Sequence, residues 1–219
     1  MYELKHKKCI LHITNGDYFN DYFLSKFGGV ALPFREAMMD GDTDITIFSE
    51  QFIRLRANSL CVSPEEYKDK ACVFKALRDN AYDELHLWFG KDTFCQVNLL
   101  TLLAYLEQIS FRGKILLNYI DDETFAPIQQ SIDVPLGIYQ SLYADILIRK
   151  QRPIETGVLN TKAIDLYFDY HSPNGALAKL VKDNANLERN ALLYLLMERS
   201  KDYGLSALQA EGLIKAINK

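Results

Sequence analysis

The sequence predicts an α/β fold: a Rossmann-like, mainly parallel sheet with flanking helices, followed by an all-helical C-terminal region. Short apolar runs at 9–13, 30–34, 85–89 and 114–120 alternate with segments of helical periodicity, which is the pattern of βαβ units. From about residue 135 the helical patterns continue without a convincing strand. A chain of 219 residues can form one large domain or a domain with an appendage. We therefore expect a Rossmann-like domain over residues 1–134 and a helical region over residues 135–219 that packs on it.

The first half of the expected domain begins with a short buried strand and an aromatic-rich helix. Residues 9–13 are apolar and end at the turn Asn15-Gly16-Asp17. Aromatic residues then recur at helical spacing over 18–27 and stop at two glycines, which are typical of a helix end. A second strand follows at 30–34, weakened by its proline. Residues 45–48 are either a strand or the start of the next helix.

The second half contains the clearest helix start of the chain. It is the segment Ser63-Pro64-Glu65-Glu66. The serine can cap the helix N-terminus, the proline occupies the first turn, and the last glutamate occupies the capping-box position. We predict that this helix ends near Asn80. A strand over 85–89 then leads into an amphipathic helix over 93–109 with one apolar stripe, and a further strand follows over 114–120.

The C-terminal region shows four helical stretches, at 136–149, 159–183, 185–200 and 205–218. The last two resemble half of a helix-turn-helix unit in outline. Residues 174–219 carry seven Lys/Arg and five Asp/Glu, a net of +2, whereas a DNA-reading helix needs a denser basic face. Packing on the protein, or contact with a partner or with a second copy in a homodimer, is therefore favoured over nucleic-acid binding.

Composition and cysteine spacing exclude several classes of protein. The chain is 48% hydrophobic and 25% charged with a net charge of −4, so it lacks the excess of Lys and Arg that non-specific nucleic-acid binding needs. The four cysteines have no CxxC or CxxxC spacing, which argues against a zinc knuckle or a disulfide scaffold and fits reduced thiols. No run approaches the ~18 apolar residues that a membrane span requires. We expect a soluble, cytoplasmic protein that does not enter a membrane.

Polar side chains follow three of the predicted strands. These segments are Asn15-Gly16-Asp17, Gly90-Lys91-Asp92 and Asp121-Asp122. The carboxyl ends of parallel strands meet at one edge of a sheet, where α/β proteins bind ligands. Carboxylates clustered there can bind a cation, act as general acid and base, or hold ribose hydroxyls. The candidate ligand-binding residues are Asn15, Gly16, Asp17, Arg35, Glu36, Arg56, Trp88, Asp92 and Gln96.

The candidates also have purely structural interpretations. The segment from Asp92 to Gln96 can simply start a helix, and Trp88 can be a core residue rather than one that stacks on a base or sugar. Arg35 can hold a phosphate or carboxylate, or it can pair with one of the acids at the edge. Arg56 is expected to belong to a structural ion pair.

No motif of known chemistry completes the site. The glycines form neither GxGxxG nor GxxxxGK[ST], which weakens a standard dinucleotide or P-loop enzyme. Cys95 is expected in the first turn of a helix, where the pKa of a thiol is lowered, but no histidine is tied to it by the sequence. His6, His86 and His171 show no metal-ligand spacing. The sequence therefore assigns no metal and leaves the cofactor unknown.

Four segments, taken together, carry a resemblance to a known family. They are Leu11-His12-Ile13-Thr14-Asn15-Gly16-Asp17, Leu32-Pro33-Phe34-Arg35-Glu36-Ala37, Arg56 with Leu60, and Leu87-Trp88-Phe89 to Asp92-Thr93-Phe94-Cys95-Gln96 with Leu99-Leu100. This combination resembles the bacterial domain-of-unknown-function family eighteen-thirty-five over residues 9–120, and Gly204-Leu205-Ser206 with Glu211 resembles its ending. Phe34 replaces the family's usual tryptophan, and Gly90 stands where many relatives carry a glutamate. The resemblance implies no reaction; it implies a set of motif positions, namely Gly16, Asp17, Arg35, Glu36, Arg56, Trp88, Asp92 and Gln96.

Three hypotheses of function follow. The leading one is a protein that binds a small anionic or nucleotide-like ligand at the carboxyl edge of the sheet, through Asp17, Asp92 and Arg35 and the helix N-termini near residues 17 and 93. The second is a hydrolase or transferase that uses Asp17 and Asp92 as an acid/base pair. The third is a regulatory or interaction protein that acts through its helical tail.

Overall fold

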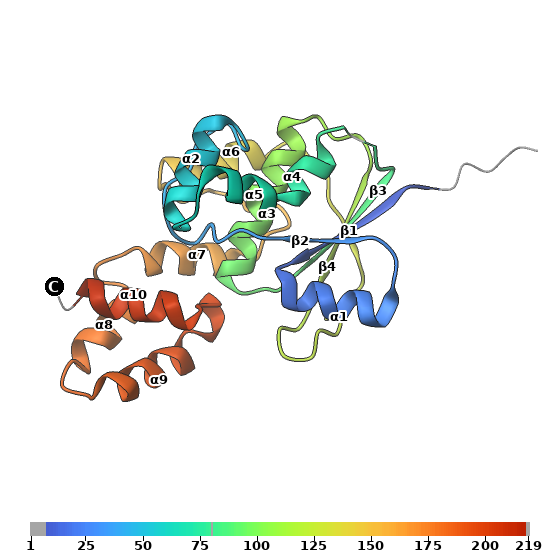
Figure 1. Ribbon diagram of the computed structural model, residues 1–219. Helices are drawn as coiled ribbons and strands as arrows, with labels where there is room; N and C mark the ends of the chain where they lie inside the picture. The colour runs from blue at the N-terminus through green and yellow to red at the C-terminus, as the bar shows by residue number, and fades with distance from the viewer. Residues whose placement is uncertain (1–7, 80, 218–219) are drawn as a thin grey trace, which may run out of the picture.

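The computed structural model describes residues 8–79 and 81–217, and it confirms the α/β fold. A five-stranded sheet runs in the order β2-β1-β3-β4-β5. Figure 1 shows α1 on one side of the strands, with α3, α4 and α5 on the other. The first four strands are parallel, and the short fifth strand, which the sequence did not predict, pairs antiparallel with β4. The strands are β1 (Ile10–Asn15), β2 (Ala31–Phe34), β3 (Glu84–Phe89), β4 (Lys114–Tyr119) and β5 (Ile132–Asp133).

One face of the sheet is covered by α1 (Asp17–Phe27). Side chains alternate between the two faces of a strand, so His12 and Trp88 both face this helix, and the Trp88 Nε1 donates a hydrogen bond to the His12 Nδ1 at 3.1 Å. Phe19 and Phe23 of α1 close a small aromatic cluster around Trp88. This face therefore has its own apolar cluster, separate from the main core.

The main core lies on the other face, beneath α5 (Thr93–Gln108). Nearly every side chain from Thr93 to Leu106 is buried, so the prediction of an amphipathic helix with one apolar stripe is wrong. The physical reason is that α6 (Tyr139–Tyr143) and α7 (Thr161–Tyr170) pack on the side of α5 that faces away from the sheet. α5 is consequently a central helix with apolar neighbours all round.

The connection from β2 to β3 contains three helices, α2 (Glu50–Ser59), α3 (Pro64–Lys70) and α4 (Cys72–Leu77). Residues 45–48 form turns that lead to the N-cap Ser49, whose Oγ accepts a hydrogen bond from the Phe52 N–H at 3.1 Å. The segment is therefore the approach to a helix and not a strand.

The single helix predicted from Ser63 to Asn80 is broken at Ala71, where ψ is +48°. Tyr67 before the break and Phe74 after it both belong to the main core. The second piece ends at Leu77, and Asn80 lies outside the described residues.

The C-terminal region is helical, as predicted, with shorter pieces than expected. α6 continues as a π-helical turn (Ala144–Ile148), and the stretch predicted at 159–183 is split into α7 and α8 by a turn at 172–175, in which the Gly175 N–H bonds to the Ser172 carbonyl. A 3₁₀ turn (Lys201–Tyr203) precedes the last helix, and residue 218 of that predicted helix is outside the described part. The remaining helices are α8 (Ala176–Asp183), α9 (Arg189–Arg199) and α10 (Ala207–Ile217).

Two kinds of contact attach the C-terminal helices to the sheet layer. Apolar residues of α9 and α10, including Leu196 and Ala210, belong to the main core. The Thr93 Oγ1 donates to the Asp202 carbonyl at 3.3 Å, and the Gln209 Nε2 donates to the Asp40 carboxylate at 2.6 Å. Within residues 8–79 and 81–217, none of the helices combines the length and the apolarity that crossing a membrane requires.

Candidate functional site

The polar segments predicted from the sequence lie at the carboxyl ends of β1, β2, β3 and β4. From β1 the chain crosses to β2 on one side, whereas β3 lies on the other side of β1. The strand order thus reverses between the ends of β1 and β3, the position at which doubly wound sheets bind ligands. The turn at Gly16 and the turn from Gly90 to Asp92 flank it.

The turn after β1 leaves the start of α1 open. Gly16 is the N-cap residue with φ +84°, a conformation that favours glycine, and no side chain caps the helix. A Cβ placed on Gly16 would have nothing within 4 Å. The turn is therefore uncrowded and the first N–H groups of α1 have no side-chain cap, which is the arrangement that binds anions at helix N-termini.

Arg35 lies beside this turn and pairs with Asp17. The guanidinium contacts the Asp17 carboxylate at 2.7 and 2.8 Å, with side-chain exposures of 36% for Arg35 and 59% for Asp17. The hydrogen bond to Asp17 raises the pKa of Arg35 above its ordinary value. The sequence left open whether Arg35 holds a ligand or pairs with an acidic residue at the edge of the sheet. The structure contains the ion pair, with Asp17, and this pair lies at the N-terminus of α1.

Asp92 lies at the next turn and caps α5. Its Oδ1 accepts a hydrogen bond from the Cys95 N–H at 2.9 Å, so the capping interpretation is correct for this residue. A carboxylate oxygen of Asp92, one of Asp122 and the Cys95 sulfur lie within 4.8 Å of one another. Gly90 makes room for the two acids, because a Cβ there would lie 2.2 Å from the Asp122 Oδ1 and 2.8 Å from the Asp92 Oδ2.

The two adjacent carboxylates hold protons more strongly than isolated ones. Burial raises the pKa of Asp92, although hydrogen bonds from the start of α5 oppose the rise. Partial desolvation of its carboxyl group and the charges of Asp92 and Asp121 raise the pKa of Asp122 to about 7, although the residue is exposed at the surface. Two neighbouring acids of this kind share protons as a pair.

The same group of atoms is a donor set that a metal could use, since carboxylate and thiolate ligands are those of zinc sites. Burial and the two nearby acids, however, raise the pKa of the Cys95 thiol well above its ordinary value. The prediction of a lowered thiol pKa at the start of α5 is therefore wrong, because burial outweighs the helix dipole. We assign no metal to this group.

Glu36 and Arg56 form a buried network, separate from the exposed pair of Asp17 and Arg35. Their ion pair measures 3.2 Å, and the exposures of the two side chains are 2% and 1%. The Tyr67 hydroxyl donates to the Glu36 carboxylate, and burial, followed by the charge of Glu36, raises the pKa of this phenol. Arg56 also donates to the carbonyls of Ala37, Asp40 and Asp42. Arg56 thereby holds the loop that follows β2, in agreement with its expected structural role.

Asn15 and Gln96 connect the strand ends to the helices behind them. The Asn15 Nδ2 donates to the Cys95 sulfur at 2.9 Å, and its Oδ1 accepts from the Asn98 Nδ2 at 3.0 Å. The fully buried Gln96 donates to the Gly90 carbonyl at 2.6 Å and accepts from the Asn160 N–H at 2.8 Å. Both side chains hold the turns in place.

The predicted residues thus separate into an open group and internal groups. Gly16, Asp17 and Arg35 lie together at the protein surface, at the start of α1. Asp92 lies in the turn that precedes α5. Trp88 faces α1 on the opposite side of the sheet from α5. Sequence reasoning missed Asn98, which bridges Asn15 to the carbonyl of Glu36 and the N–H of Met38; the one available signal was a polar residue inside an apolar helix.

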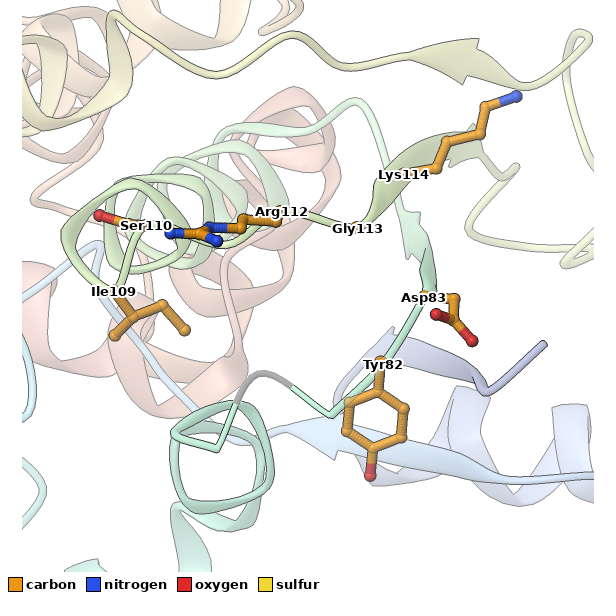
Figure 2. A pocket seen from close by; sticks show the side chains of 7 residues that line it. All are labelled: Tyr82, Asp83, Ile109, Ser110, Arg112, Gly113 and Lys114. Carbon is orange, nitrogen blue, oxygen red and sulfur yellow. The ribbon is translucent and has the colours of Figure 1, made fainter. Parts of the chain in front are cut away.

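A cavity of about 540 Å³ lies at the opposite edge of the sheet, between the end of α5 and the starts of β3 and β4. Figure 2 shows that its charged side chains, Asp83, Arg112 and Lys114, point in different directions and do not converge on a common point. Amino ends of parallel strands are also not where such sheets bind ligands. We place no functional site there.

Comparisons with known proteins add no relative. No protein-family model matches the chain. Searches of curated proteins and of solved structures find no match either. The functional argument therefore depends on the geometry at the carboxyl edge of the sheet.

Proposed function

We propose that the protein binds a small anionic or nucleotide-like ligand at the carboxyl edge of the sheet. The observation that carries the proposal is the N-terminus of α1, which has no side-chain cap and lies where the strand order reverses between β1 and β3. A phosphate or carboxylate placed there would accept hydrogen bonds from main-chain N–H groups and lie at the positive end of the helix dipole.

The positive charge of Arg35, beside the turn after β1, supports the binding of an anion there. The guanidinium offsets the charge of Asp17, so the negative side chain at the first position of α1 does not act alone on an incoming anion. Because both side chains are partly exposed, their ion pair contributes little free energy, and Arg35 can turn from Asp17 to a ligand phosphate at small cost.

Titration with AMP, inorganic phosphate and adenosine tests this proposal. We expect AMP to bind at least tenfold more tightly than adenosine, which lacks the phosphate. Arg35→Gln should weaken AMP binding about 10- to 100-fold, because a hydrogen bond to a charged group contributes about 1.5–3 kcal/mol. Isothermal titration calorimetry measures both effects.

The matched control is Arg54→Gln, which removes an exposed arginine of α2 that contacts Gln51. This variant should bind AMP as the wild type does, and Arg35→Gln should leave adenosine binding unchanged. Wild-type protein that binds neither AMP nor phosphate at millimolar concentration would refute the proposal, as would undiminished AMP binding by Arg35→Gln.

The second candidate is a hydrolase or transferase in which Asp92 is an acid/base group. The structure places Asp17 in the ion pair with Arg35 and places Asp122, not Asp17, beside Asp92. The observation that favours this candidate is the pKa of Asp122, raised to about 7, because an acid/base group works best when its pKa is near the working pH.

The raised pKa predicts how stability depends on pH. The native state holds the Asp122 proton more tightly than the unfolded chain does, so this group stabilises the protein below about pH 4 and the stabilisation is lost as the pH rises through about 7. Three pKa units correspond to about 4 kcal/mol, but Asp122 is exposed and solvent screening reduces this to about 1–2 kcal/mol. Asp122→Asn should therefore gain this much stability relative to the wild type between pH 4 and pH 8, measured by urea unfolding.

Glu123→Gln is the control, because it removes a neighbouring exposed carboxylate from the same loop. Its stability should stay parallel to that of the wild type over the same pH range. A constant difference between Asp122→Asn and the wild type from pH 4 to pH 8 would remove the support for Asp122 as an acid/base group.

We also propose that the chain acts in the cytoplasm and belongs with the bacterial family it resembles. The four cysteines are free in the structure, which supports a reducing compartment. The family resemblance is supported by its motif positions, several of which lie at the carboxyl edge of the sheet.

A further inference from the structure

A second cavity, of about 490 Å³, lies between the sheet layer and the C-terminal helices. Its walls come from the loop after β2, the end of α2, the start of α5 and the start of α10. Apolar atoms form most of the lining, with contributions from Leu60, Phe94, Leu205 and Leu208. Residues 37–94 supply one part of the lining and residues 204–209 the other, so parts of the chain that are more than 100 residues apart form one hollow.

The polar side chains of this cavity are already bonded to protein partners. Asp40 accepts hydrogen bonds from the Tyr170 hydroxyl at 3.0 Å and from the Gln209 Nε2 at 2.6 Å. The Gln209 Oε1 accepts from Ser206, and the Ser59 Oγ donates to the Leu55 carbonyl. The lining therefore offers a ligand apolar surface rather than free hydrogen-bonding groups, and the carboxylate of Asp40 disfavours an anion.

Two further observations indicate an occupant. Leu208, which lines the cavity, is 80% exposed. Exposed apolar surface is unfavourable in water, so a ligand that covers Leu208 and the cavity wall would lower the free energy. The volume is within the range of about 300–1,000 Å³ found for small-molecule sites.

We propose that this cavity binds an uncharged, mainly apolar small molecule. The site is distinct from the open turn at Gly16: its ligand would lie against Phe94 and α10, on the side of α5, and needs no anionic group. The proposal does not depend on the proposed function.

The neutral fluorescent probe N-phenyl-1-naphthylamine tests the site directly. We expect one equivalent to bind with a rise in fluorescence, and Leu60→Trp, which fills the cavity, to weaken binding at least tenfold. Ile154→Trp is the control, because Ile154 is fully exposed in another part of the chain and its replacement should leave probe binding unchanged. Near-UV circular dichroism of both variants verifies that they are folded.

A second measurement leaves the side chains that line the cavity unchanged and follows the alkylation rate of Cys61. Cys61 lines the cavity and is exposed, so in a Cys9→Ser, Cys72→Ser background the bound probe should slow its alkylation by N-ethylmaleimide at least tenfold. Three results would overturn the proposal: no probe binding, equal binding by Leu60→Trp, or alkylation of Cys61 at an unchanged rate. Tighter binding of the anionic probe 8-anilinonaphthalene-1-sulfonate than of the neutral one would overturn the assignment of an uncharged ligand.

Discussion

Replacing Arg56 with methionine should destabilise the protein by about 3–5 kcal/mol, because the change leaves the Glu36 carboxylate buried without its counter-charge. The guanidinium of Arg56 is fully buried and is bonded to Glu36 and to three carbonyls of the loop after β2. Methionine fills much of the volume but donates no hydrogen bond. Urea unfolding at pH 7 gives the change in the free energy of unfolding.

Two further variants show whether the loss comes from the ion pair. Arg54→Met, at an exposed position of the same helix, should change stability by no more than about 0.5 kcal/mol. Glu36→Gln combined with Arg56→Met should cost less than the sum of the two single changes, because the two charges are then removed together. A loss below about 1 kcal/mol for Arg56→Met would show that the buried pair is not essential for folding.

Replacing Gly204 with alanine should destabilise the protein by about 2–3 kcal/mol, since it combines backbone strain with a disturbed helix cap. Gly204 has φ +68°, in the left-handed region, and a Cβ there would lie 2.0 Å from the Asp92 Oδ1. That oxygen accepts the hydrogen bond that starts α5, so a shift of Asp92 would weaken the cap. Thermal unfolding measured by circular dichroism quantifies the effect.

Gly212→Ala is the matched control, in the helix that follows. A Cβ at Gly212 has nothing within 4 Å, and alanine is favoured over glycine inside a helix by up to about 1 kcal/mol, so this variant should be slightly more stable than the wild type. If both variants unfold at the same temperature, the contact between Gly204 and Asp92 does not fasten the C-terminal region to α5.

The strands and the carboxyl edge were predictable because their signals are local. A buried parallel strand is a short apolar run, and such runs correspond to β1, β2, β3 and β4. Turns that follow the strands, at Gly16 and Gly90, were equally visible in the sequence. The short β5 was not, because two residues that pair with the edge of a sheet have no periodicity of their own.

The environment of α5 could not be read in the same way. Its sequence predicts one apolar stripe, yet the helix is buried all round, because helices from the C-terminal region cover its far side. The break at Ala71 was not visible either: the capping box at Ser63 indicates where a helix starts, but the apolar spacing of Tyr67 and Phe74 continues at helical period across the break.

The fold class, the four parallel strands and the polar turns after β1, β3 and β4 can be read from the amino-acid pattern. The pairing of the charged side chains depends on the tertiary packing, which brings together Asp17 with Arg35, Glu36 with Arg56, and Asp92 with Asp122. The spacing of apolar residues within a segment indicates which of its side chains can be buried. The partner of a charge depends on which distant segment packs against it, and the pKa of that charge depends on how much water the packing leaves.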